Sequence, residues 1–270
     1  MTSVRLTSLL LVEERLFEAD YFVSRLRRSQ PHHLQYNLNA FLSAARSVTF
    51  LLQKEMAHVP GFREWLAVKQ DELRADAAAR FFLLLRNFSQ KEGRVRTVGF
   101  GSSTSRRRWT YRFAEGTHPV PPELYDRDIV ECCSEHVAKL ARLTLEFADA
   151  FPAYSCLHRA LTPDGVASLG VPLADLAAAA GLPDGWLDVA PSDIEAQLAG
   201  LRTLVDAVDF AAIRRLSRPR RRTRTTCQEG AAMRRLLLGN VQRGPEGYAT
   251  IAAALLMGGF PSVGRQDSEP

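Results

Sequence analysis

The sequence predicts an all-α protein, an up-and-down four-helix bundle with an inserted β-hairpin and a small C-terminal helical region. Four long segments repeat apolar residues at spacings of three and four, which is the period of an amphipathic helix. Between the third and the fourth, two short runs rich in alternating and aromatic residues flank a Gly-Ser-Ser-Thr-Ser segment, a pattern typical of a hairpin. The 270 residues suffice for one large domain or for one domain with an appendage.

The first two helices are predicted on either side of Pro31. The first spans about residues 13–28, where Leu16, Val23 and Leu26 belong to one apolar face. Pro31 ends it and starts the second, at about residues 32–57, because proline suits the first turn of a helix and interrupts a preceding one. Short connections of this kind make neighbouring helices antiparallel.

The third helix, the hairpin and the fourth helix complete a predicted bundle over residues 1–160. A turn at Pro60-Gly61 leads into one long third helix, from Phe62 to about Gly93, whose glycine suits a helix end. The hairpin occupies residues 94–113. The fourth helix runs from about Ile129 to Phe151 and on towards Leu161.

The remainder of the chain changes in composition. Residues 161–216, rich in Ala, Gly, Pro and Asp, are predicted to form a small helical accessory region. It contains a short helix, Leu173 to Ala180, followed by Gly181, and a weaker helix from Ser192 to Leu216. Residues 217–270 begin with an arginine-rich run and are predicted to be a basic, disordered tail, which serves either as an RNA-binding arm or only as a low-complexity end.

Composition excludes several classes of protein. No apolar run approaches the roughly 20 residues of a membrane span, and Glu13 and Glu14 interrupt the longest one, so we expect a cytoplasmic protein with no membrane contact. The four cysteines show no zinc-site spacing and are expected to be reduced packing residues, and no metal or cofactor is predicted. The net charge of +5 comes from one segment: residues 214–243 hold ten arginines and Glu229, which leaves 25 of the 35 basic and 29 of the 30 acidic residues elsewhere.

The predicted topology brings many cations to one end of the bundle. Helix one ends there, helix two begins there, helix three ends there, and the hairpin and the start of helix four lie beside them. We call this region the basic end. It is predicted to collect Arg27, Arg28, His32, His33, Arg86, Asn87, Lys91, Arg94, Arg96, Arg106, Arg107, Arg108 and Arg112.

The segment Arg86-Asn87 with Lys91, at the end of helix three, resembles the signature of the HEPN family of small helical bundles, many of which cleave RNA. Lys91 stands where that family has histidine. The resemblance implies a homodimer with one composite site, in which Arg86 stabilises the phosphorane, Asn87 orients the phosphate and Lys91 contributes charge. It also implies a role in toxin–antitoxin or antiviral stress systems, with an antitoxin or a nucleotidyltransferase as partner.

Metal-independent cleavage of RNA needs a base for the 2′-hydroxyl, positive charge for the phosphorane and an acid for the leaving oxygen. Lysine, with a reference pKa of about 10.4, holds a phosphate but is a poor base, whereas histidine, at about 6.5, transfers protons at neutral pH. His32 and His33 are therefore the candidates for proton transfer. Because residues five apart point about 140° away from each other on a helix, Arg86 and Lys91 converge only if the helix ends between them.

Two readings of these residues stay open. In one, the protein is an RNA-binding or RNA-cleaving effector, and Arg106, Arg107, Arg108, Trp109 and Arg112 of the hairpin contact phosphates and bases. In the other, Arg86 and Asn87 only cap a helix end, the hairpin aromatics lie on the bundle while its arginines are solvated, and the protein is a non-catalytic interaction or dimerisation module. The sequence leaves open whether the protein is an enzyme.

Overall fold

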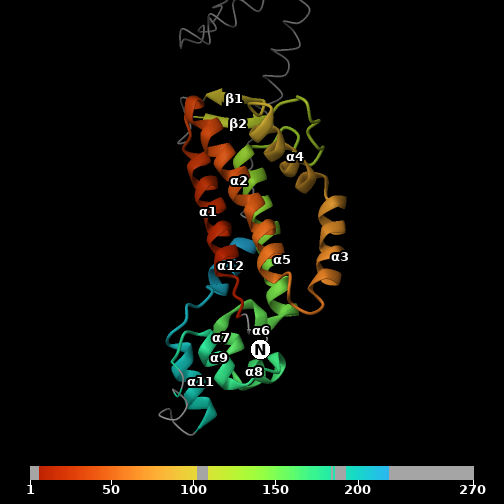
Figure 1. Ribbon diagram of the computed structural model, residues 1–270. Coiled ribbons are helices and arrows are strands. Elements are labelled where there is room, and N and C mark those ends of the chain that lie inside the picture. The colour runs from red at the N-terminus through yellow and green to blue at the C-terminus, as the bar shows by residue number, and fades with distance from the viewer. Residues whose placement is uncertain (1–5, 102–108, 184, 186–192, 219–270) are drawn as a thin grey trace, which may run out of the picture. The chain divides into compact units, whose positions relative to one another are not determined.

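The structure, a computed structural model, describes residues 6–101, 109–183, 185 and 193–218 of the chain. The described residues are mostly helical and contain a single two-stranded sheet (Figure 1), so the predicted all-α class with an inserted hairpin is confirmed. The chain divides into the units 1–220 and 221–270, and every described residue lies in the first. From residue 219 on, the predicted basic tail lies outside the described residues.

Helices α1 (Leu10–Arg27) and α2 (Pro31–Met56) pack against each other along their lengths. Their facing residues are apolar and recur at helical spacing, as Leu16 and Val23 do on α1, so burial drives the pairing. The short turn between them is held by Ser29, whose hydroxyl donates to Arg25 O (3.0 Å) and accepts from Asn37 Nδ2 (2.7 Å). The turn therefore fixes the end of α1 against the start of α2.

The expected single third helix is wrong, because the chain breaks at Asp76 into α3 (Phe62–Ala75) and α4 (Ala77–Lys91). Asp76 has an extended backbone (φ −75°, ψ 109°), and its carboxylate accepts a hydrogen bond from Ala79 N at 2.9 Å as the N-cap of α4. The same carboxylate is bonded by Lys139. A cap and an ion pair at one residue thus compensate for the interrupted helix.

The hairpin consists of β1 (Thr97–Gly101) and β2 (Trp109–Phe113), which pair antiparallel with Thr97 opposite Phe113. It is shorter than the predicted 94–113 range, and residues 102–108 lie outside the described part. Phe113 packs edge-on against Phe81 of α4, with ring centroids 5.2 Å apart. Tyr111 donates its hydroxyl to Ser29 O at 3.0 Å, so the hairpin is fastened to the α1–α2 turn.

Helix α5 (Ile129–Ala150) contacts α1, α2 and β2, and most of its residues are buried. Asp128 caps its start by accepting from Val130 N at 3.0 Å. Near its other end, Phe147 meets Phe62 and Trp65 of α3, both with ring centroids 5.7 Å away. Helix α5 is therefore the element that both the hairpin and α3 rest on.

Short helices follow α5: α6 (Pro152–Ser155), α7 (Leu157–Ala160), α8 (Pro163–Leu169), α9 (Leu173–Ala179), α11 (Ile194–Arg202) and α12 (Phe210–Ser217). Leu161, Leu176, Leu198 and Leu201 form a separate small core. Within the expected helix of residues 192–216, the structure has α11 and α12 with a non-helical stretch between them.

Helix α12 falls in the range assigned to the accessory region, yet it packs on α5. Its Ile213 belongs to the same core as α1, α2 and α5. Glu13 of α1 also accepts from Asp209 N at 2.7 Å. Burial of the Glu13 carboxyl raises its pKa, although the bond from Asp209 N opposes this.

Candidate nucleic-acid interface

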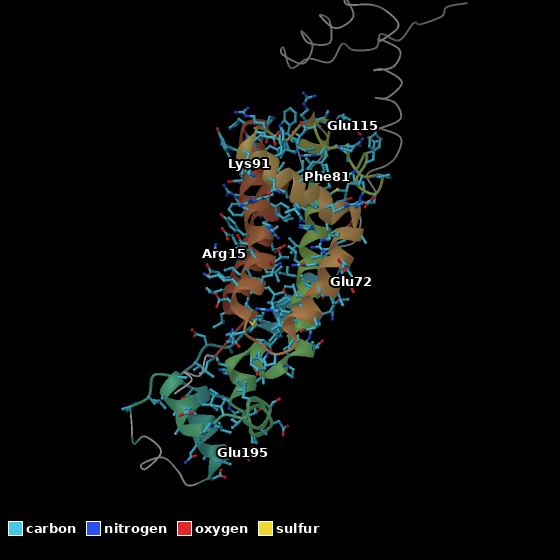
Figure 2. All side chains as sticks on the ribbon, turned by 45° about the vertical axis from the view of Figure 1, so that its right-hand side comes forward. Arg15, Glu72, Phe81, Lys91, Glu115 and Glu195 are labelled. Atoms are coloured by element: carbon cyan, nitrogen blue, oxygen red, sulfur yellow. The ribbon has the colours of Figure 1, made fainter. Side chains whose placement is uncertain are left out.

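The predicted meeting of elements at the basic end is what the structure shows for the described residues. Helix α1 ends, α2 begins and α4 ends beside the hairpin (Figure 1). Gln35 of α2 donates to Val95 O at 2.8 Å, which joins the start of α2 to the segment between α4 and β1. In Figure 2, Lys91 and Glu115 both lie at this end of the helices.

Five cations of the basic end are exposed: Arg27, Arg28, Lys91, Arg94 and Arg96. Within the described part of the chain, none of the five forms an ion pair. Glu92 and Glu115 are exposed at the same end, as is Asp126, which binds Arg112, so the five cations outnumber these three acids. Exposed and unpaired cations are free to contact phosphate oxygens.

His32 and His33 are exposed in the first turn of α2, with ring centroids 3.9 Å apart. They share the basic end with Lys91, as predicted. Both imidazole rings are accessible to solvent.

Arg86, Asn87 and Lys91 do not converge within one chain. Helix α4 continues through Lys91, so Arg86 and Lys91 leave the helix about 140° apart, whereas Asn87 and Lys91 share a face. Arg86 is half-buried and donates to Asn87 Oδ1 at a long 3.3 Å, while its Nε has no hydrogen-bond partner among the described residues. It faces α2, where burial first and then the charge of Arg86 lower the pKa of Arg46.

The described hairpin residues bear on both interpretations of the sequence, in which the hairpin either contacts RNA or packs its aromatic side chains on the bundle. Tyr111 and Phe113 are buried against the helices, as the alternative reading expects. Trp109 is half-buried and stacks on Tyr111 with centroids 6.4 Å apart. Arg112 is engaged within the fold, over the Phe100 ring at 5.0 Å and with Asp126 at 3.2 Å. Arg106, Arg107 and Arg108 lie outside the described residues.

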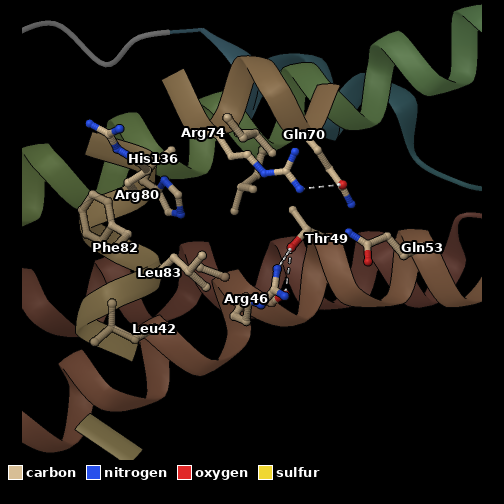
Figure 3. A pocket seen from close by; sticks show the side chains of 14 residues that line it. Leu42, Arg46, Thr49, Gln53, Gln70, Arg74, Arg80, Phe82, Leu83 and His136 are labelled. Carbon is tan, nitrogen blue, oxygen red and sulfur yellow. Dashed lines mark hydrogen bonds between the residues drawn. The ribbon is translucent and has the colours of Figure 1, made fainter. Parts of the chain in front are cut away.

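A second cationic region, which sequence reasoning missed, is a cavity of about 250 Å³ between α2, α3, α4 and α5. Figure 3 shows Arg46, Arg74, Arg80 and His136 around it, with Gln53 and Gln70. No aspartate or glutamate lines it. A signal was present in α2, where Arg46, Thr49 and Gln53 follow one another at spacings of three and four, which places them on one side of the helix.

His136 forms part of the cavity wall and is only 9% exposed. Its ring stacks on Phe82 at 4.4 Å between centroids, and its Nδ1 has no hydrogen-bond partner among the described residues. Burial, together with the positive charge of Lys139, lowers its pKa from 6.5 to about 4, against the opposing charge of Asp76. The imidazole is therefore neutral at pH 7.

The described cysteines are free and buried, as expected of packing residues. Burial raises the pKa of Cys132 to about 12, so its thiol stays protonated and unreactive. Cys227 lies outside the described residues. Among the residues that the structure describes, no three histidine, cysteine or carboxylate side chains are grouped as metal ligands, and none of the helices combines the length and apolar composition needed to cross a membrane.

Residues 8–106 match the family of bacteriophage lambda protein ea47. The matched segment extends from before α1 to beyond β1 and covers less than half of the 270 residues. It holds Arg86, Asn87, Lys91 and Arg46, whereas His136 lies outside it. No curated protein and no solved structure matches the chain.

Proposed function

We propose that this protein is a HEPN-like RNA-binding effector that takes RNA at its basic end. The observation that carries the proposal is the set of five exposed, unpaired cations gathered from α1, α4 and the segment leading to β1. Cations of this kind that contact phosphates give a binding constant that falls steeply with salt. The description of the matched phage family names no activity, so the proposal depends on the residues of this chain.

The finer architecture belongs to the same proposal. Helices α1, α2, the broken pair α3 and α4, and α5 form an up-and-down four-helix bundle, supported by the packing of α1 on α2 and α5 and of α2 on α4. In this arrangement the ends of three helices and the hairpin face the RNA together.

Cleavage of the RNA needs more than one chain supplies. Arg86 and Lys91 diverge on α4, so a composite site requires a second copy, in keeping with the homodimer of the HEPN resemblance. In that site Arg86 stabilises the phosphorane, Asn87 orients the phosphate, Lys91 adds charge, and His32 or His33 transfers protons. An antitoxin or a nucleotidyltransferase would act by covering this end.

The alternative proposal is a non-catalytic interaction or dimerisation module. It is favoured by large apolar side chains that α2 and α4 leave exposed: Tyr36 is 67% exposed, Phe50 55% and Leu84 42%. In this case the same cations would hold an acidic partner instead of RNA.

RNA affinity, measured on the full chain at two salt concentrations, distinguishes the RNA-binding effector from the interaction module. RNA affinity is measured at low and at physiological salt for the wild type and for an Arg28→Glu/Arg94→Glu double variant. The matched control is Arg63→Glu, an exposed residue in the first turn of α3, separated from the basic end by the length of α2, about 39 Å. Loss of RNA binding in the double variant alone supports the effector, and unchanged binding refutes it.

Cleavage is tested separately, by incubating the protein with total RNA in the presence of a chelator. Activity that disappears in Arg86→Ala and in a His32→Ala/His33→Ala variant supports the composite site. Cleavage that survives Arg86→Ala would contradict the assigned role of Arg86, and RNA binding without cleavage makes the protein an inactive relative.

A further inference from the structure

We propose that the cavity between α2, α3, α4 and α5 is a binding site for a small organic phosphate, with Arg46 receiving the phosphate group. None of the residues that line this cavity belongs to the basic end, and the site does not depend on RNA binding.

The guanidinium of Arg46 carries a charge that no acidic side chain of the described residues compensates. Arg46 is half-buried, and the contact of its guanidinium within the described residues is to Thr49 Oγ1 of its own helix, at 2.9 Å. Buried charges in proteins are normally paired. Arg86, whose charge acts on Arg46 from outside the cavity lining, is also positive, so an anion in the cavity would offset a charge that its surroundings leave uncompensated.

Arg46 is not the only arginine among the residues that line the cavity. Arg80 and Arg74 also line the cavity, and Arg74 is paired at 2.7 Å with Asp71, which is not among the lining residues. Figure 3 shows the Arg74 and Arg46 side chains on facing helices, α3 and α2, across the cavity. Guanidinium groups that approach from different helices suit the several oxygens of a phosphate.

His136 gives a second, independent indication of a ligand. Its Nδ1 is buried in the cavity wall without a hydrogen-bond partner among the described residues. A buried polar atom of this kind costs free energy unless something bonds it. A hydroxyl or carbonyl group on the organic part of the ligand can form that bond once the imidazole ring turns this atom towards the cavity, while Leu42, Phe82 and Leu83 contact its carbon atoms.

The size of the cavity limits the ligand. Its volume of about 250 Å³ is less than the roughly 300–1,000 Å³ of sites for drug-sized molecules. A phosphorylated sugar or a similar short-chain phosphate fits this volume.

The test is calorimetric titration of the full chain with ribose 5-phosphate, ribose and inorganic phosphate. The variants are Arg46→Gln, which keeps a hydrogen-bonding side chain without the charge, Arg46→Lys, which keeps the charge, and His136→Phe, which keeps the stacking on Phe82. Arg63→Gln is the matched control. Circular dichroism establishes that each variant is folded.

We expect ribose 5-phosphate to bind the wild type and Arg63→Gln alike, at least tenfold weaker to Arg46→Gln, and with intermediate affinity to Arg46→Lys. His136→Phe should weaken ribose 5-phosphate and leave inorganic phosphate unchanged, because only the organic part reaches Nδ1. Failure of the wild type to bind at millimolar concentration, or equal binding to folded Arg46→Gln, would overturn the site. Equal affinity for inorganic phosphate would overturn the organic ligand. RNA binding should be the same in Arg46→Gln, which separates this result from that for the basic end.

Discussion

Arg94 at the basic end and Arg46 at the cavity both lack a carboxylate partner among the described residues, yet their surroundings differ. Arg94 is exposed, so water solvates its charge and the missing partner costs little. Arg46 is half-buried beside Arg86, where burial and repulsion already lower its pKa. An unpaired arginine therefore costs little free energy at the basic end and more at the cavity. For this reason Arg46 is the stronger sign of a bound anion.

The difference predicts opposite responses to mutation. Changes around the cavity should alter the free energy of unfolding, and changes at the basic end should alter RNA affinity while stability stays the same.

The largest effect is expected from acid. Because the pKa of His136 is about 4 when folded and 6.5 when unfolded, the unfolded chain binds more protons between these values. Stability from this group is complete above pH 6.5 and falls as the pH drops towards 4, by about 3 kcal/mol in all. Denaturant unfolding at pH 7 and 4.5 measures it.

Other groups titrate over the same range, so the comparison is made between variants. Glu13, with its raised pKa, opposes the loss as the pH falls. His136→Phe should show a flatter pH dependence than the wild type, whereas Arg63→Gln, which removes no group that titrates between pH 4 and 7, should keep the wild-type slope. Equal slopes for all three proteins would show that His136 is not buried in its neutral form.

The second effect concerns the break between α3 and α4. Asp76→Ala removes the N-cap of α4 and the partner of Lys139, and should destabilise the protein by about 2 kcal/mol. Asp76→Asn still accepts from Ala79 N and should lose about half of that. Asp71→Ala, which breaks an exposed pair with Arg74, is the control, with an expected change of under about 0.5 kcal/mol. Chemical denaturation ranks the three, and equal losses for Ala and Asn would refute the capping role.

The third effect has the opposite sign. Arg46→Gln removes a half-buried charge that has no acidic partner and lies beside Arg86, so it should raise the free energy of unfolding by about 1 kcal/mol in the absence of ligand. Arg63→Gln, exposed on α3, should change it by less than about 0.5 kcal/mol. A loss of stability in Arg46→Gln would mean that the stem of the arginine packs more usefully than its charge costs.

The smallest effect on stability belongs to the basic end. Arg28→Glu and Arg94→Glu should each change unfolding by under about 0.5 kcal/mol. Each should, however, lower RNA affinity at every sequence tested and reduce the slope of log affinity against log salt by about 1. Filter binding over a salt series measures this, and a slope identical to the wild type would place RNA elsewhere.

Much of the fold and part of the candidate site could be predicted. The spacing of apolar residues predicted the positions of α1, α2 and α5, because helical periodicity depends on residues that are close together in the sequence. The antiparallel order of helices then placed Lys91 at the same end as Arg27 and Arg28. The direction in which Arg86 points could not be obtained in this way, since it depends on where α4 ends and on what α2 presents to it.

The sequence by itself determined the helical class, the turn at Pro31, the hairpin and the exposed charges of the basic end, since each depends on residues close together in the chain. Only the tertiary structure decided the break at Asp76, which Lys139 stabilises from 63 positions away. It also decided the proximity of the like charges of Arg46 and Arg86 and the stacking of His136 on Phe82. A cavity is the volume that packed helices leave unfilled, and that volume depends on contacts between distant residues which no local pattern specifies.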